Sequence, residues 1–260
     1  MLRLLDVRTG SYAEVRSVRR GLLRVCAHVP EAAGGSDLAG LRVLLVADLL
    51  VRTAELRDFQ VLTVLARQDQ DPARWAVFDR AADALNIHPP AARAGPGAAR
   101  ASLGGPIDVH LVGADTDSGG DQSGLVTRVG PVRPREAGPL GESAADQPDP
   151  LAIRLALLSF PYYRPADLTE DMLAQARLTL ARWRRRVAEW AQSPSRPAPA
   201  PVANRLKAAF DDLDTAAALA LLRGLEPDDD VPPGAKFETL VYADRILGLD
   251  LPRDIGRAGG

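Results

Sequence analysis

A glycine-rich stretch, GGSDLAG at residues 34–40, is the first arrangement in this sequence that could bind a charged ligand. It runs directly into an apolar helical pattern, and the free N–H groups at the start of a helix are a common phosphate-binding site. The stretch holds neither histidine nor lysine, and it places the acidic Asp37 beside Gly40. The junction therefore has the form of a nucleotide-binding loop without the side chains that would act on a phosphate.

A second polar loop, ADTDSGGDQSG at residues 114–124, follows the apolar segment 107–113. Open α/β sheets bind ligands at the carboxyl ends of their strands, which is where this loop would lie. Asp115 comes shortly after Gly113, and an acidic residue at a strand end can hold the hydroxyls of a ribose. The alternative is an aspartate that only caps its own loop.

Three side chains could bind a metal or a small substrate: Cys26, His28 and His110. Cys26 and His28 are two residues apart, so on a strand they share a face. A zinc site needs three or four ligands, and these three residues are a poor set, so we expect no metal. His110 is more typical of a histidine packed in a core. With only one cysteine, the chain cannot form an internal disulfide or a multi-cysteine zinc site.

Alternating apolar segments and helical patterns predict the elements that position these residues. The continuous apolar runs 22–29, 60–66 and 107–113 are typical of buried parallel strands. Amphipathic patterns after Asp37 and over 71–85 predict helices between them, the second with Trp75, Phe78, Ala82 and Leu85 on its inner face. The order β-α-β-α predicts an α/β fold, a Rossmann-like doubly wound parallel sheet.

The second part of the chain reads as helical. A helix is expected from 149–159, a longer one after a Thr169 cap, and three short ones over 202–211, 215–223 and 236–247, the middle one capped by Asp214. We expect three regions: a nucleotide-binding-type domain at 1–150, connecting helices at 151–192 and a C-terminal helical bundle domain at 202–260. Loops are expected at 88–106 and 130–149, and a stiff linker at 193–201.

Composition narrows the classes of partner. The formal net charge is −2, which argues against a domain that grips nucleic acid by bulk charge. The arginine cluster RWRRR at 182–186 could touch RNA or an acidic partner, but a solvated helix face is the simpler interpretation. No segment is long and apolar enough to serve as a leader or a membrane span, so we expect a cytoplasmic protein with no membrane partner.

Several segments, in order along the chain, resemble class I cysteinyl-tRNA synthetases and the actinobacterial cysteine ligases of mycothiol synthesis. RVLLVADLLVRTAELRDFQVLTVLARQDQD resembles the first half of their nucleotide-binding domain, ADALNIHPP their D-x-x-A-L-x-V-x-P-P stretch, and IDVHLVGAD their D-I-x-G-G-G-x-D. DPLAIRLALLSFPYYR, FDDLDTAAALALL and ADRILGLDL lean toward the mycothiol-type ligases. The resemblance implies a class I synthetase type of fold, ATP and an aminoacyl adenylate as ligands, and a zinc ion that selects a thiolate.

The departures from the family pattern bear on function. Counting from Asp48, the family's H-I-G-H motif falls on Asp37, Leu38, Ala39 and Gly40, so both histidines are replaced. The same count puts His28 at the family's first zinc cysteine, and the other zinc ligands have no counterpart. The lysine-containing mobile loop of the family falls near residues 130–134, where Arg133 and Arg135 are the basic side chains, either reaching a phosphate or solvated. We expect nucleotide contacts from Asp37, Gly40, Gly113, Asp115, Arg133 and Arg135, substrate contacts from His28 and His110, and no catalytic residue.

Three functions remain open. The first is a pseudoenzyme on a synthetase-like scaffold that binds a small-molecule ligand, such as ATP or an adenylate, or a partner, as a homodimer or with an active relative. The second is an ATP-dependent amino-acid-activating ligase with an altered substrate and a rebuilt phosphate site using Asp115, Arg133 and Arg135. The third is an RNA-binding module that uses the arginine helix, although tRNA is not the partner that the composition favours.

Overall fold

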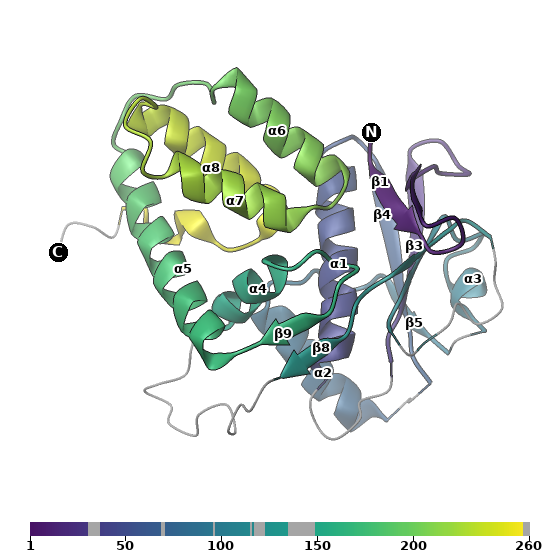
Figure 1. Cartoon of the computed structure of the whole chain (residues 1–260). Helices are drawn as coiled ribbons and strands as arrows, with labels where there is room; N and C mark the ends of the chain where they lie inside the picture. The colour runs from purple at the N-terminus through teal and green to yellow at the C-terminus, as the bar shows by residue number, and fades with distance from the viewer. Residues whose placement is uncertain are drawn as a thin grey trace. The chain divides into compact units, whose positions relative to one another are not determined.

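The computed structural model describes residues 1–30, 37–68, 71–95, 97–114, 116, 123–134 and 149–256. The chain divides into two compact units. Unit 1 comprises Met1–Arg133, Tyr162–Ala166 and Asp211–Leu213, and unit 2 comprises Pro134–Pro161, Asp167–Phe210 and Asp214–Gly260. The elements of the two units are coloured along the chain in Figure 1.

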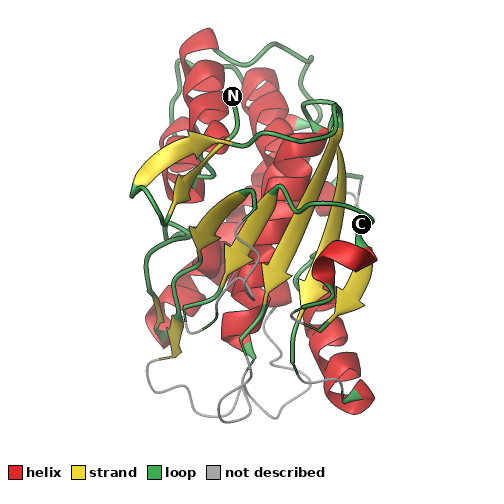
Figure 2. Ribbon diagram, turned by 90° about the vertical axis from the view of Figure 1, so that its right-hand side faces the viewer, coloured by secondary structure: helices red, strands yellow, loops and turns green. Residues whose placement is uncertain are grey.

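Unit 1 is built on a five-stranded parallel sheet with strand order β5-β4-β3-β6-β7. The strands are β3 (Leu22–His28), β4 (Gln60–Ala66), β5 (Ala92–Ala94), β6 (Val109–Val112) and β7 (Leu125–Arg128). The long central strands are β3 and β4, which pair over their whole length from Leu22↔Gln60 to His28↔Ala66. In Figure 2 these arrows point the same way, so the strands share one carboxyl edge. This confirms the predicted Rossmann-like α/β fold.

Helices cover the two faces of the sheet. Helix α1 (Leu38–Glu55) packs on β3, β4 and β6 and also against α2 (Pro72–Ala84). The short helix α3 (Ala99–Ser102) packs on β4 and β5. Cys26, Val64 and Ala66 form a buried apolar cluster with Ala99 and Leu103 of the α3 segment. Because side chains alternate along a strand, Thr63 and Leu65 lie on the other face of β4.

An antiparallel hairpin of β1 (Arg3–Asp6) and β2 (Ser11–Glu14) precedes the sheet. It is attached to β7, where the Val7 N–H donates to the carbonyl of Val126 at 2.9 Å. Arg42, buried inside α1, donates to the carbonyls of Gly130 and Arg164 at 2.9 and 2.7 Å. Burial lowers the pKa of Arg42 to about 10, which leaves the guanidinium charged at neutral pH.

Unit 2 is helical, as expected for the C-terminal part of the chain. Its helices are α4 (Pro150–Leu158), α5 (Glu170–Trp190), α6 (Ala200–Asp211, whose last residue falls in unit 1), α7 (Thr215–Leu225), α8 (Pro233–Leu247) and the 3₁₀ turn η1 (Leu251–Asp254). The caps follow the sequence: Thr169 accepts from the N–H of Met172 at 3.2 Å, and Asp214 accepts from that of Ala217 at 2.9 Å. Trp183, Val187 and Leu180 of α5 are buried.

The arginine cluster of α5 forms a solvated face, as expected, through the exposed side chains of Arg182, Arg185 and Arg186. Arg184 is the exception, with a side chain that is only 7% exposed. The Arg184 guanidinium donates to the carbonyls of Asp250 and Leu249 at 3.1 and 3.0 Å and pairs with Asp149. The helical period turns neighbouring arginines to different sides, so Arg184 holds η1 and the start of α4 rather than a solvent-facing partner.

Two further short strands, β8 (Val132–Pro134) and β9 (Ala166–Leu168), pair with each other. The loop expected over 88–106 contains β5 and α3, and β7 was not identified in the sequence. No helix in the described parts of the chain has the length and apolar character needed to cross a membrane.

Candidate functional site

The carboxyl edge of the unit 1 sheet brings together several residues that the sequence analysis selected. His28 ends β3, Gly113 follows β6, and Asp37 immediately precedes α1. Arg67, which follows β4, joins them and was not selected. A charged residue directly after a buried strand was the available signal, because such a residue lies at the edge where parallel sheets bind ligands.

Asp37 and Arg67 form an ion pair at the start of α1. The Arg67 Nη1 donates to the Asp37 Oδ2 at 2.7 Å, and the two side chains are 3% and 20% exposed. The guanidinium also lies over the rings of Trp75 and Phe78, 5.7 and 5.5 Å from their centroids. Burial raises the pKa of Asp37 above its ordinary value, and the Arg67 charge offsets part of this shift.

Asp37 occupies the N-cap position of α1, but its side chain makes no capping hydrogen bond. The carboxylate turns to Arg67 instead. A negative charge there is favourable, because the helix dipole places partial positive charge at this end. Asp37 thus puts the protein's own anion at the place where such helices bind phosphates.

Two glycines allow close approach of the chain at this edge. A Cβ on Gly40 would lie 2.5 Å from the Asp37 Oδ1 and 2.6 Å from the Val29 Cγ1. A Cβ on Gly113 would lie 2.9 Å from the Pro30 Cδ. At both positions, neighbouring atoms of the protein itself leave no room for a Cβ, so these atoms account for the glycines.

His28 and His110 meet across adjacent strands. The pairing of β3 with β6 sets Cys26 opposite His110, and the His28 Nε2 lies 2.9 Å from the His110 Nδ1. Their rings are stacked, with centroids 5.2 Å apart and an angle of 24° between planes. Both side chains are buried, so they contact each other inside the protein rather than lining an open substrate pocket.

Cys26 completes a group of three potential metal ligands. One ligand atom from each of Cys26, His28 and His110 can be chosen so that all three lie within 4.8 Å of one another. Thiolate and imidazole are the ligands that zinc prefers, and three protein ligands are the number found in open zinc sites. Tetrahedral bonds separate two zinc-bound nitrogens by about 3.3 Å, so the histidines would move apart by a few tenths of an ångström. The donor set fits zinc, although the sequence analysis predicted no metal.

The remaining predicted residues are not gathered at this edge by the described structure. Arg133 is exposed on β8. Asp115 and Arg135 lie outside the described residues. Arg128, at the end of β7, is a further cation near the edge, but its guanidinium donates to the carbonyl of Ala114 at 2.6 Å.

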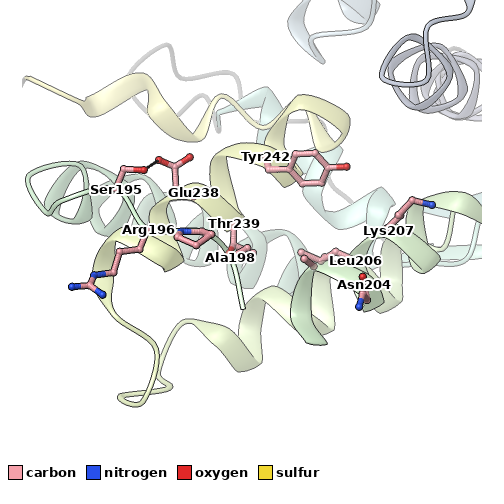
Figure 3. Close-up of a pocket in the computed structure, with 11 residues that line it drawn as sticks. Ser195, Arg196, Ala198, Asn204, Leu206, Lys207, Glu238, Thr239 and Tyr242 are labelled. Atoms are coloured by element: carbon pink, nitrogen blue, oxygen red, sulfur yellow. Dashed lines mark hydrogen bonds between the residues drawn. The ribbon is translucent and has the colours of Figure 1, made fainter. Parts of the chain in front are cut away.

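Unit 2 contains a separate pocket of about 600 Å³ beside α6 and α8. The Ser195 Oγ donates to the Glu238 Oε1 at 2.6 Å at its margin. Figure 3 shows the charged ends of Arg196 and Lys207 extending in opposite directions, with the Tyr242 ring between them. These polar groups do not converge, so the pocket does not define a ligand chemistry.

The strand order and the helix start at the carboxyl edge together define a Rossmann-like α/β protein. Comparison with known proteins identifies relatives among cysteine ligases. Over 119 residues the chain is 35% identical to the L-cysteine:1D-myo-inositol 2-amino-2-deoxy-alpha-D-glucopyranoside ligase of Cellulomonas flavigena, a match that covers 42% of this chain and 27% of that protein.

Two further relatives have similar sequence identity and coverage. The ligase of the same name from Acidothermus cellulolyticus is 33% identical over 132 residues, covering 50% of this chain and 32% of that protein. The cysteine–tRNA ligase of Paracoccus denitrificans is 40% identical over 104 residues, covering 40% of this chain and 20% of that protein. The matched segments thus span between a fifth and a third of these relatives. No protein-family model matches the sequence.

Proposed function

We propose that this protein is a non-catalytic relative of the cysteine ligases that acts by binding a small ligand of the adenylate type. The observation that carries the proposal is the ion pair between Asp37 and Arg67 at the start of α1. It supports a site that holds a ligand without activating its phosphates.

The electrostatic argument concerns the phosphates of ATP. Two like charges 4 Å apart repel by about 4 kcal/mol in the partly solvated surroundings of a protein surface. An incoming triphosphate would meet the Asp37 carboxylate, and the Arg67 cation that could offset it is already neutralised. ATP, whose triphosphate carries several negative charges, should therefore bind weakly, whereas an aminoacyl adenylate or its sulfamoyl analogue carries a single negative charge at the linker and is repelled less.

The same pair argues against catalysis. Each preorganised donor aimed at the charge of a transition state contributes about 3 kcal/mol to the rate enhancement. An aspartate at the helix start acts in the opposite sense, because it disfavours the additional negative charge of a pentacovalent phosphorus. We infer that adenylate formation is lost even if an adenylate is still recognised.

Two measurements test the proposal. ATP–pyrophosphate exchange should be absent with cysteine and with each of the other common amino acids, while an active cysteine–tRNA ligase assayed in parallel gives exchange. In a thermal-shift assay, a cysteinyl-sulfamoyl adenosine should raise the Tm more than ATP does at equal concentration, because binding to the folded state stabilises it. Robust exchange with any amino acid would overturn the proposal, and so would a larger shift with ATP.

A further inference from the structure

A pocket of about 300 Å³ lies in unit 1 beside α1, away from the carboxyl edge. One side of α1 forms a wall through Leu44, Asp48, Val51 and Glu55, which follow the helical spacing. Asp37 precedes Asp48 by eleven residues, about 16 Å along the helix axis. The pocket is therefore separate from the candidate site at the carboxyl edge, and neither Asp37 nor Arg67 lines it.

Asp48 and His88 form a fixed polar pair in this pocket. The Asp48 Oδ1 accepts from the His88 Nδ1 at 2.7 Å and from the His88 backbone N–H at 3.1 Å, and its Oδ2 accepts from the Arg52 Nε at 2.9 Å. The Asp48 side chain is fully buried, while that of His88 is 52% exposed. In a neutral imidazole whose Nδ1 donates to the carboxylate, the Nε2 is a hydrogen-bond acceptor.

Thr63 supplies a second polar group, from β4. The residue is 8% exposed, lines the pocket, and its Oγ1 has no hydrogen-bond partner in the described structure. Buried hydroxyls are almost always hydrogen-bonded, so this one is available to a group that enters the pocket. Its two lone pairs can accept hydrogen bonds, as the His88 Nε2 can.

Glu55, the last residue of α1, adds a negative charge at the pocket. Its side chain is exposed, and the described residues provide it with no salt bridge. The buried charge of Asp48 is compensated by Arg52, so the carboxylate of Glu55 sets the charge that a ligand meets. The remaining walls are apolar, formed by residues such as Val61 and Pro89.

We propose that this pocket binds a small primary alkylammonium ion. The ammonium group has three N–H donors, which match the acceptors on Thr63 and His88, and its charge complements Glu55. The short alkyl chain would pack against Leu44, Val51 and Val61. An alcohol would lose the attraction to Glu55, and a carboxylate would be repelled by it.

The test uses the full chain and n-butylammonium as the probe. Ligand-observed NMR should give saturable binding, with a Kd of roughly 1 mM as is usual for so small a ligand. Isotope-edited spectra should show a selective shift of the His88 ring nitrogens. Butanol should bind at least threefold more weakly, and butyrate should not bind.

Three substitutions locate the interaction. Thr63→Val, which keeps the side-chain shape, and Glu55→Gln should each weaken butylammonium binding at least threefold. Asp58→Asn is the matched control: it removes an exposed negative charge just past the end of α1, outside the pocket lining, and should change the Kd by less than twofold. Because the Thr63 hydroxyl is unpaired, Thr63→Val should retain the wild-type Tm, which separates lost binding from misfolding.

The proposal fails if wild-type protein shows no saturable binding of butylammonium, or if butanol and butyrate bind equally well. It also fails if Thr63→Val and Glu55→Gln leave the Kd unchanged. These outcomes are independent of pyrophosphate exchange, which tests only adenylate formation at the carboxyl edge of the sheet.

Discussion

The His28 Nε2 lies 2.9 Å from the His110 Nδ1, although 82 residues separate the two histidines in the chain. Adjacent parallel strands bring them together, because β3 and β6 pair with Cys26 opposite His110. The resulting group consists of one thiol and two imidazoles, and all three side chains are buried. A metal bound there would link the two strands without meeting a substrate.

The first prediction concerns this group. We expect protein purified with zinc to carry one zinc ion per chain, and cobalt substitution to give the charge-transfer absorption of a thiolate ligand. Cys26→Ala should lose that absorption, whereas His88→Gln, which removes a histidine outside the group, should keep it. Metal analysis that finds no zinc after incubation with excess zinc would contradict this expectation and support the prediction made from the sequence.

The second prediction concerns Asp37. Asp37→Asn removes the carboxylate charge and leaves the Arg67 guanidinium available to a phosphate, so ATP should bind at least tenfold more tightly than to the wild type. Isothermal titration calorimetry measures the two Kd values. The control is Asp83→Asn, which neutralises an exposed aspartate of α2 and should leave the ATP Kd within about twofold. Equal ATP affinity in the wild type and Asp37→Asn would show that Asp37 does not exclude phosphates.

The third prediction follows from the raised pKa of Asp37, whose main cause is burial. The folded state takes up the Asp37 proton at a higher pH than the unfolded chain does. The contribution of Asp37 to stability therefore increases as the pH falls from neutral through the folded-state pKa toward 3.8. Urea denaturation at pH 7 and pH 4.5 should show the wild type gaining stability relative to Asp37→Asn at the lower pH. A relative loss at pH 4.5 would mean that Arg67, not burial, dominates.

Long apolar segments made much of unit 1 predictable. The strand at 60–66 has the predicted bounds, and β3 ends one residue before the predicted segment does. The short strands β5 and β7 were missed, because three or four residues carry too little pattern and are held by backbone pairing with β4 and β6. Their existence depends on the neighbouring strand rather than on their own side chains.

The candidate site was predictable in its parts but not in its contacts. Asp37 and Gly40 were placed correctly at the start of a helix, because cap residues and apolar periodicity are local signals. The partner of Asp37 is Arg67, thirty residues away, and the partner of His28 is His110. Both contacts are set by strand order and register, which a single sequence does not specify.

The last prediction separates the two roles of the arginines in α5. Arg184→Met removes the buried donors to the carbonyls of Leu249 and Asp250 and leaves Asp149 with only the exposed Arg253 as its partner, so it should lower the free energy of unfolding by roughly 3 kcal/mol. Arg185→Gln is the matched control, because this neighbouring side chain is exposed and pairs only loosely with Glu189 at 3.8 Å. It should change stability by less than about 0.5 kcal/mol. Chemical denaturation of the two variants provides the comparison.

A gel-shift assay with single-stranded and duplex RNA tests the exposed side of α5. We expect no RNA binding that Arg185→Gln abolishes. Salt-sensitive binding that is lost in this variant would identify the exposed side of α5 as an RNA-contacting surface.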